Sequence, residues 1–550
     1  MADVRACVRC RVRPEVVQVR EAVYCAECYA RVFSEKTRSS LELVRGAVLL
    51  QSVVQPFQAG LDHGPPPAFA VAYSGGQASS VLLHAVSNMF QSRNQPYVPA
   101  RAPEFSRIYA LFVDDGQMPI EEARDRVAKL APNASFVPLR LDSVYDTGAV
   151  SCILEQRGGP RWLNDDQPAS DDAASAFLAL LQVIKPENTP RTAIPSAQSR
   201  VEDLRKIFMH RVLRRAAEDL GCAALLYGHS AARTAALLLE GISQGAGHKL
   251  PIESASSLWW SDSRDLLVVH PLRSHLPEEL QFYEASHGLG AGHQRNIASS
   301  YEAQADKTSI GRLTQSLIDS LQHGVSSTVS TVAGTGSKLV YRPDRVWQTH
   351  SDTAETTQGP AVSLLSIRSD SENKQDEADP TKDSPPFPRI GAKGEGLVRA
   401  AEGIQHYDPG AEPNACPLCS YPAQRGASNW RQARSVTSLH PGNATPPKTH
   451  GIDLRAKLCY SCIQILDTPE FPAQAQEEGA AHAPLPRYVA DALQPRSKKG
   501  PRPKNHIPDT LYDSPQQNDT VPHLSGGRSS HASVPVSREA MHASVASYLL

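Results

Sequence analysis

Phe69-Ala-Val-Ala-Tyr73, followed at once by Ser74-Gly75-Gly76, is the stretch that decides the fold of this 550-residue chain. The first five residues form a short apolar run of the kind found in strands that are buried on both faces. The two glycines permit a tight turn, and an apolar-periodic segment from Ser79 to Phe90 predicts a helix after it. A buried strand, a glycine turn and a helix in this order predict one unit of a parallel sheet covered by helices.

The same alternation of strand and helix continues along the chain. Four further apolar runs predict buried strands, at 108–113, 136–141, 223–227 and 266–270. Helices are expected over 201–220 and 310–322, whereas the segment 142–198, with its Pro and Asp clusters, is expected to be an irregular insertion. We therefore predict an α/β fold with a Rossmann-like, mostly parallel sheet in a domain over 46–340.

Cysteine is concentrated at the two ends of the chain, where eight of the ten cysteines form four Cys-x-x-Cys pairs. Two pairs a short loop apart supply four thiolates, the ligand set of a closed, tetrahedral, structural zinc site. The expected zinc ligands are Cys7, Cys10, Cys25 and Cys28 in a unit over 1–45, and Cys416, Cys419, Cys459 and Cys462 in a unit over 411–470. Both units are predicted to be zinc-ribbon-like, the second with a loop at 423–450. A disulfide framework is the alternative, which a chain without a secretory signal does not favour.

Composition limits what the remaining segments do. The segments 341–410 and 471–550 are polar and poor in large apolar residues, so they are predicted to be disordered. A formal net charge of −2 gives no overall basic field, so any nucleic-acid contact needs a local basic patch. No apolar run approaches the roughly 20 residues of a membrane span, so we expect no membrane contact and a cytoplasmic location.

One such basic patch lies on the predicted helix 201–220, which has five cationic side chains beside its apolar stripe. As candidate RNA contacts these are Arg205, Lys206, Arg211, Arg214 and Arg215. A solvated helix face explains the same charges equally well.

The glycine turn is a candidate phosphate site. Glycines at a strand–helix junction let a phosphate approach the backbone, and the N–H groups that open the helix point toward it. The candidates are Ser74, Gly75, Gly76 and Ser79, joined by Gly228 and His229, which follow a later strand at the same carboxyl edge. The alternatives are a tight turn for the glycines and a structural hydrogen bond for His229.

These two turns resemble those of the PP-loop ATP pyrophosphatase family, whose enzymes adenylate a carbonyl oxygen, often on a tRNA base. The family's Ser-Gly-Gly-x-Asp-Ser loop has an acidic residue where this chain has Ala78. Its Gly-His-Asn-x-x-Asp turn ends in an acid where this chain has Arg233. The resemblance implies a PP-loop fold, but the missing carboxylates remove supports for Mg²⁺, so binding of ATP and Mg²⁺ stays open.

Within that family the chain resembles the cytoplasmic tRNA 2-thiolation protein 2 branch. The resemblance rests on the degenerate loop and on motifs between residues 7 and 462: the four cysteine pairs, Lys36-Thr-Arg38, Leu313 to Gln322, Ser326 to Val332 and Thr335 to Leu339. It implies a heterodimer with a catalytic PP-loop paralogue that replaces oxygen by sulfur at C2 of the wobble uridine in tRNAs for Lys, Glu and Gln. The implied sulfur donor is a thiocarboxylated ubiquitin-related modifier.

The middle of the chain lacks the cysteines that such chemistry needs. The catalytic paralogues have a Cys-x-x-Cys in the helix that here runs Ser199 to Lys206, and no cysteine lies between Cys222 and Cys416. We therefore expect a non-catalytic subunit of the thiolating complex. The alternatives are an autonomous ATP-pyrophosphatase-type enzyme that adenylates tRNA, and a non-enzymatic zinc-ribbon adaptor for RNA or protein.

Overall fold

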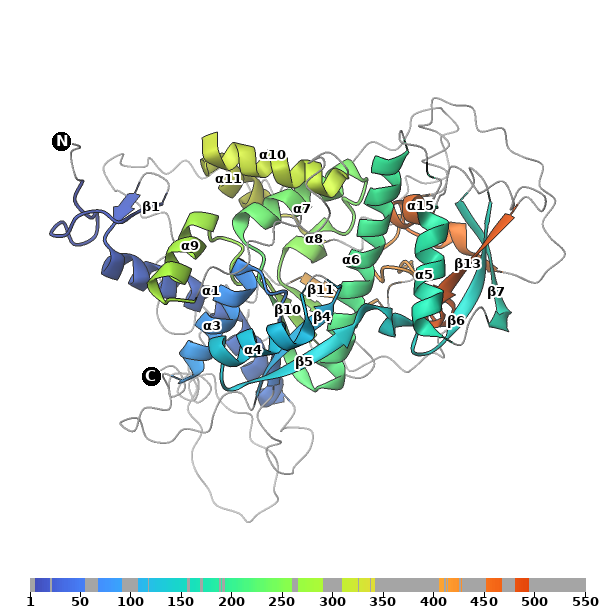
Figure 1. Cartoon of the computed structure of the whole chain (residues 1–550), viewed down its shortest axis with the longest axis horizontal. Coiled ribbons are helices and arrows are strands. Elements are labelled where there is room, and N and C mark those ends of the chain that lie inside the picture. The colour runs from blue at the N-terminus through green and yellow to red at the C-terminus, as the bar shows by residue number, and fades with distance from the viewer. Residues whose placement is uncertain are drawn as a thin grey trace, which may run out of the picture. The chain divides into compact units, whose positions relative to one another are not determined.

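A central seven-stranded sheet organises the molecule (Figure 1), in the strand order β11-β9-β10-β8-β3-β4-β5. The computed structural model describes residues 5–54, 68–91, 107–289, 309–341, 405–427, 452–466 and 480–493, with short breaks at 20–21, 117, 156–158, 169–171, 187–188, 190–192, 260–265, 325, 337, 410–411, 413 and 425–426. All of these residues belong to one compact unit.

The five strands expected from sequence form the parallel part of this sheet. They are β3 (Ala68–Ala72), β4 (Ile108–Asp114), β5 (Ala134–Arg140), β8 (Cys222–Tyr227) and β10 (Leu266–Val269). Two short strands extend it: β9 (Ser257–Trp259) runs antiparallel to β10, and β11 (Gln405–Tyr407) runs parallel to β9. The predicted α/β fold with a mostly parallel sheet is confirmed.

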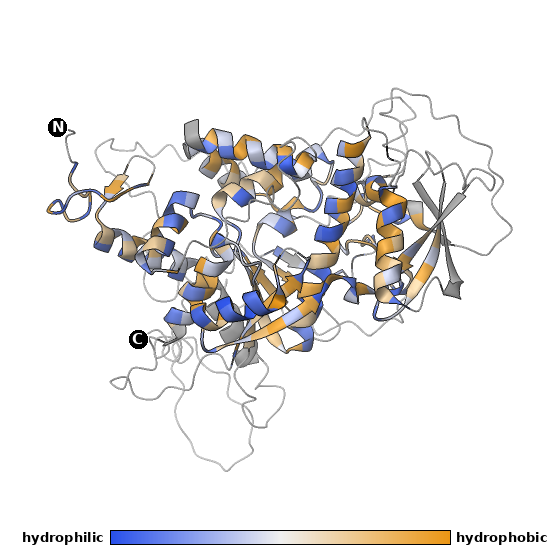
Figure 2. Ribbon diagram, viewed as in Figure 1, coloured by the Kyte–Doolittle hydropathy of each residue, from blue (hydrophilic) through white to orange (hydrophobic). Residues whose placement is uncertain are grey.

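Helices cover both faces of the sheet, as the alternation of side chains on β3 shows. Ala68 and Ala70 belong to one hydrophobic cluster, whereas Phe69 and Val71 belong to another on the opposite face. In Figure 2 the strands visible at the centre of the sheet are mostly orange, as expected of apolar strands that are covered on both faces. The helices between and after the strands are α3 (Gln77–Gln91), α4 (Ile120–Leu130), α6 (Ile194–Asp219), α7 (Ala231–Ser243), α8 (Leu250–Ser254), α9 (Pro277–Ser286), α10 (Ile310–Gly324) and α11 (Ser326–Gly336).

A second, four-stranded sheet corrects two expectations. It has the order β12-β7-β6-β13, in which β12 spans Ile452–Asp453. The strands β6 (Ala149–Glu155) and β7 (Gly159–Pro168) lie in the segment expected to be irregular, which also holds α5 (Ala173–Ile184). The strand β13 (Ala480–Pro486) and helix α16 (Arg487–Asp491) lie in the tail that was expected to be disordered. The physical reason is that β13 becomes a strand by pairing antiparallel with the distant β6, which no local pattern reveals.

The other disordered segments expected from sequence fall mostly outside the described residues. This holds for 341–410 apart from its ends, for the loop at 423–450 after residue 427, and for the tail beyond residue 493. In the described part of the chain, no helix is long and apolar enough to cross a membrane.

The N-terminal segment docks on the core through one helix. A hairpin of β1 (Val17–Val19) and β2 (Ala22–Tyr24) leads into α1 (Ala26–Val54). Phe33 of this helix stacks on Tyr283 of α9, with ring centroids 4.4 Å apart. Its Lys36 donates to both carboxylate oxygens of Glu279, at 3.0 and 2.8 Å. Lys36 of the Lys36-Thr-Arg38 motif therefore links α1 to α9 by an ion pair.

We predict that Glu279→Ala lowers the free energy of unfolding by about 3 kcal/mol, because it leaves the Lys36 ammonium of a buried pair without its carboxylate. It also removes the acceptor of the Leu276 N–H at the start of α9, which lies 2.5 Å from the carboxylate. The measurement is thermal unfolding of the full chain. The control is Glu278→Ala on the same helix, an exposed change that we expect to cost no more than about 0.5 kcal/mol. Equal losses in the two variants would contradict the prediction.

Candidate functional site

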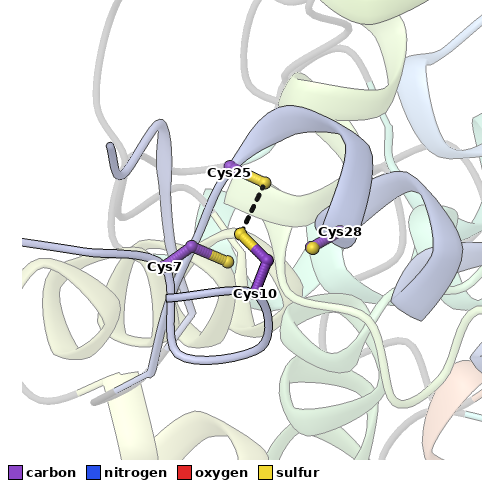
Figure 3. A group of neighbouring side chains, drawn as sticks. All are labelled: Cys7, Cys10, Cys25 and Cys28. Atoms are coloured by element: carbon purple, nitrogen blue, oxygen red, sulfur yellow. Dashed lines mark hydrogen bonds between the residues drawn. The ribbon is translucent and has the colours of Figure 1, made fainter. Parts of the chain in front are cut away.

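The first four-cysteine group joins a loop to the start of α1. Cys7 and Cys10 lie in the loop before β1, and Cys25 and Cys28 lie at the helix start (Figure 3). All four Sγ atoms lie within 4.8 Å of one another, and those of Cys10 and Cys25 are 3.9 Å apart. Four thiolates at about 2.3 Å from a tetrahedral zinc ion would be about 3.8 Å from each other. The geometry of the group therefore fits such an ion.

Backbone hydrogen bonds shape this loop into a knuckle around Cys7. The N–H of Arg11 donates to Cys7 O at 2.8 Å, and the N–H of Cys7 donates to Arg13 O at 2.9 Å. Burial raises the pKa of the Cys7 thiol, but backbone hydrogen bonds from Cys10, Cys25 and Arg9 outweigh it and lower the pKa to about 6. The knuckle thus favours the thiolate, the form that binds a metal.

The second group repeats this geometry inside the main hydrophobic cluster. Cys416 and Cys419 lie in a knuckle whose Ser420 N–H donates to Cys416 O at 2.8 Å, and Cys459 and Cys462 flank the start of α15 (Tyr460–Leu466). The Sγ atoms of Cys419 and Cys459 are 3.7 Å apart. All four thiols are at least 97% buried and belong to the same cluster as the side chains of α6 and β8. This group is therefore part of the core.

Both predicted cysteine sites are thus assembled as four-thiol groups that can each hold a metal ion. All ten cysteines are free in this structure, which does not support the disulfide alternative. The sequence identified every member of both groups.

The glycine turn is closed by contacts of its own residues. Ser74 Oγ and Ser79 Oγ share a hydrogen bond at 3.1 Å, and Ser79 Oγ donates to Gly76 O at 3.0 Å. Gly75 has a φ of +77°, and a Cβ there would meet the side chain of Met118 at 2.5 Å. The turn and this close contact account for the serines and for Gly75 without any phosphate.

The second turn packs tightly against the first. A Cβ on Gly228 would lie 2.9 Å from the backbone of Ser79, so only glycine allows β8 and α3 to approach this closely. The half-buried ring of His229 stacks on His270, with centroids 4.9 Å apart and an angle of 15° between the planes. The stack continues through Tyr227 to His210, with centroid distances of 5.5 and 5.3 Å. The structure therefore brings the two candidate turns together and uses His229 in packing.

Sequence reasoning missed His210 and His270 as members of this stack. His270 directly follows β10 at the same carboxyl edge as Gly228, a position that the parallel-sheet rule could have flagged. His210 had no such signal, because it stands among the cationic residues of α6. Burial lowers the pKa of His210 to about 4 and that of His270 to about 3, so both rings are neutral at pH 7.

The cationic residues of α6 are largely used inside the protein. Lys206 forms ion pairs with Asp203 and Glu240, the guanidinium of Arg211 lies 3.6 Å from the ring centroid of Tyr488, and that of Arg214 lies 3.8 Å from the ring of Trp259. Arg205 is half-buried. Arg215 is exposed and pairs with Asp219, one turn along the helix, at 3.7 Å. Among the five candidate RNA contacts, Arg215 is therefore the one that the structure leaves exposed.

A small polar cavity lies between α6, α8 and the second cysteine group. Its lining includes Asp203, His210, Lys249, Glu253 and Tyr421, and its volume is about 30 Å³. Since one water molecule needs roughly 10–15 Å³ on this scale, the cavity holds about two waters and no nucleotide.

Comparison with known proteins identifies relatives. A model of the family described as cytoplasmic tRNA 2-thiolation protein 2 matches residues 309–464, from α10 through the second cysteine group. A protein of this name from Danio rerio is 24% identical over 382 residues, which is 64% of this chain and 70% of the relative. Another from Emericella nidulans is 31% identical over 232 residues, which is 40% of this chain and 63% of the relative.

Among solved structures, the chain is similar to a U34-tRNA thiolase from Methanococcus maripaludis that carries a 4Fe–4S cluster. The TM-score is 0.38 at 14% sequence identity, and the match covers 61% of this chain and 87% of the thiolase.

We predict that the two cysteine groups differ in what they stabilise. Cys459→Ser should reduce the bound metal from two ions to about one per chain and lower the thermal midpoint of the whole unit, because a structural metal contributes roughly 10–16 kcal/mol to the fold that encloses it. Cys10→Ser should also remove one metal ion but leave the midpoint near that of the wild type, because Cys10 is half-exposed at the N-terminal knuckle. Mass spectrometry for metal content and calorimetry provide the measurements. Equal midpoints in the two variants would refute the distinction.

We predict that stability falls as the pH drops below about 6.5, because His210 and His270 have pKa values below that of an unfolded histidine. Each contributes stability that is fully present above pH 6.5 and is lost at up to about 1.4 kcal/mol per pH unit on the way down to its folded pKa. Burial raises the pKa of Asp203 to about 6, which offsets part of this loss.

The measurement is the thermal midpoint between pH 7.5 and 5.0, with His210→Phe as the test variant because it keeps a ring on Tyr227. This variant should lose less stability on acidification than the wild type. The effect of Asp203 is present in both proteins and therefore cancels in the comparison. Parallel pH profiles would show that His210 does not contribute to the acid sensitivity.

Proposed function

We propose that this chain, which matches the model of the cytoplasmic tRNA 2-thiolation protein 2 family over residues 309–464, is a non-catalytic subunit of the complex that 2-thiolates the wobble uridine, U34, of tRNA. In this proposal it forms a heterodimer with a catalytic PP-loop paralogue, which acts on the tRNAs for Lys, Glu and Gln. The sulfur comes from a thiocarboxylated ubiquitin-related modifier. The relatives carry the word cytoplasmic in their names, in agreement with the location expected from sequence.

The main support for a non-catalytic role is that every cysteine is either in a four-thiol group or buried. Eight of them form the two metal groups, and the remaining two are Cys152 and Cys222, each with no exposed surface. Burial raises the pKa of the Cys152 thiol to about 12, so its nucleophilic thiolate is not populated at pH 7. Among the described residues, which include every cysteine, no thiol is placed to carry sulfur.

The state of the glycine turn supports the same role. In the proposal Ser74, Gly75, Gly76, Ser79, Gly228 and His229 are remnants of a nucleotide site, and the catalytic paralogue binds the ATP and Mg²⁺ that drive adenylation. The turn is filled by its own serine hydroxyls and by Met118, and Ala78 and Arg233 stand where a carboxylate would support Mg²⁺.

We further propose that both four-cysteine groups hold zinc and that the role of the zinc is structural. Four thiolates complete a tetrahedral shell and leave no position for water or substrate. The ligands are Cys7, Cys10, Cys25 and Cys28 in one site, and Cys416, Cys419, Cys459 and Cys462 in the other.

The test is reconstitution of thiolation from the full chain, the catalytic paralogue, ATP, tRNA and the sulfur donor, with 2-thiouridine measured by mass spectrometry. We expect product only when both proteins are present. In the complex, Cys152→Ala, Cys222→Ala and Ser74→Ala should retain activity within about twofold, because each residue has a packing role and no role in the chemistry.

Three results would contradict this proposal. Thiolation by the isolated chain would show an autonomous enzyme. Loss of activity in a folded Cys222→Ala complex would show a sulfur carrier. Loss in a Ser74→Ala complex that still binds tRNA would show a working nucleotide site.

A further inference from the structure

The two cysteine knuckles share a strained backbone position directly after their second cysteine. Arg11 follows Cys10 with a φ of +56°, and Ser420 follows Cys419 with a φ of +63°. In the described residues, these are the two non-glycine residues with a positive φ. Each donates its N–H to the first cysteine of its knuckle, so the knuckle itself imposes the left-handed conformation. Glycine adopts this conformation without strain, whereas a residue with a Cβ does not.

At the second knuckle the protein uses the strained residue internally. Ser420 Oγ accepts a hydrogen bond from Arg211 at 3.3 Å, and its carbonyl oxygen accepts one from the Tyr407 hydroxyl at 2.7 Å. These contacts fix the knuckle against α6 and β11. The side chain at this position therefore has a partner inside the fold.

At the first knuckle the strained residue, Arg11, is exposed to solvent. Its guanidinium forms no hydrogen bond or ion pair with any residue that the structure describes. The three neighbouring arginines are each paired with a glutamate: Arg5 with Glu15, Arg9 with Glu35 and Arg13 with Glu27. An unpaired arginine therefore occupies a position where glycine would fit with less strain, which indicates a role outside this chain.

The surroundings of Arg11 favour a polyanion as the partner. Residues 5–13 contain four arginines and no acidic residue, although the whole chain has a formal net charge of −2. The next residue, Val12, is 83% exposed, so an apolar surface lies beside the guanidinium. Arginine binds phosphate through two parallel N–H···O bonds, and an adjacent aliphatic side chain suits a ribose or a base.

We propose that the N-terminal knuckle is a tRNA-binding surface, in which Arg11 contacts a phosphate of the RNA backbone. This inference rests on the proposed function, which supplies the RNA. It places the RNA contact in the loop between Cys7 and Arg13 and not on α6. The glutamates paired with the flanking arginines neutralise their charges, so Arg11 supplies the contact with the phosphate.

Arg11→Gly tests this directly, because it removes the guanidinium while relieving the backbone. In the reconstituted heterodimer, we expect the affinity for tRNA at about 0.15 M salt to fall roughly three- to tenfold. The plot of log affinity against log salt concentration should become shallower by about 1, the signature of one lost phosphate contact. Zinc content and thermal midpoint should stay at or above their wild-type values.

Two variants serve as controls. Ser420→Gly makes the same backbone change at the twin knuckle and should leave the affinity for tRNA and its salt dependence unchanged. Arg11→Lys keeps the charge at the tip and should retain most of the affinity and the salt slope.

Several outcomes would overturn the inference. Unchanged tRNA affinity for Arg11→Gly would do so, as would a loss of affinity with an unchanged salt slope. Dissociation of the heterodimer by Arg11→Gly would assign the knuckle to a protein contact instead. A wild-type heterodimer that binds tRNA and thiolates it would keep the proposed function even then. A wild-type heterodimer that does neither would refute the proposed function and this inference together.

Discussion

The buried second cysteine group is the constraint on which the C-terminal third of the described structure depends. Its two pairs are brought together from Cys416–Cys419 and Cys459–Cys462, segments with little regular structure of their own. Arg211 of α6 packs on Tyr488, whose hydroxyl donates to Leu418 O in the knuckle at 2.9 Å. Since β13 leads directly into α16, which carries Tyr488, the same group also anchors the second sheet. Closing the loop between the two cysteine pairs costs chain entropy, and the binding energy of a metal held here would offset that cost.

The same knuckle geometry has opposite surroundings at the two ends of the chain. At the C-terminal group the four thiols and the ring of Tyr421 are buried, and the hydroxyl and carbonyl groups of Ser420 have partners inside the protein. At the N-terminal group the knuckle projects from β1 and α1, and Arg11 and Val12 face the solvent. The C-terminal knuckle is therefore part of the core, whereas the N-terminal knuckle presents side chains to the solvent. The residue with a positive φ differs accordingly: it is Ser420 in the first case and Arg11 in the second.

The parallel sheet and both cysteine groups could be predicted from sequence because their signals are local. Each central strand is a buried apolar run, and each cysteine pair has fixed spacing. The second sheet could not, because β6 pairs with β13 more than 300 residues away and neither strand carries a strong pattern. The basic residues of α6 were visible in sequence, but their partners were not: the carboxylate of Glu240 and the rings of Trp259 and Tyr488 come from three distant segments.

In the proposed function, the glycine turn is a nucleotide site in which packing contacts occupy the place of catalytic groups. A phosphate loop keeps its glycines free and its hydroxyls unpaired so that an anion can enter. Here, without carboxylates at positions 78 and 233, Ser74 and Ser79 bond to each other and Met118 fills the space beside Gly75. Gly228 then brings β8 onto α3, and neutral histidines stack at the strand ends. Gly228 is required in this arrangement because its backbone lies against the backbone of Ser79, a requirement as strict as the approach of a phosphate.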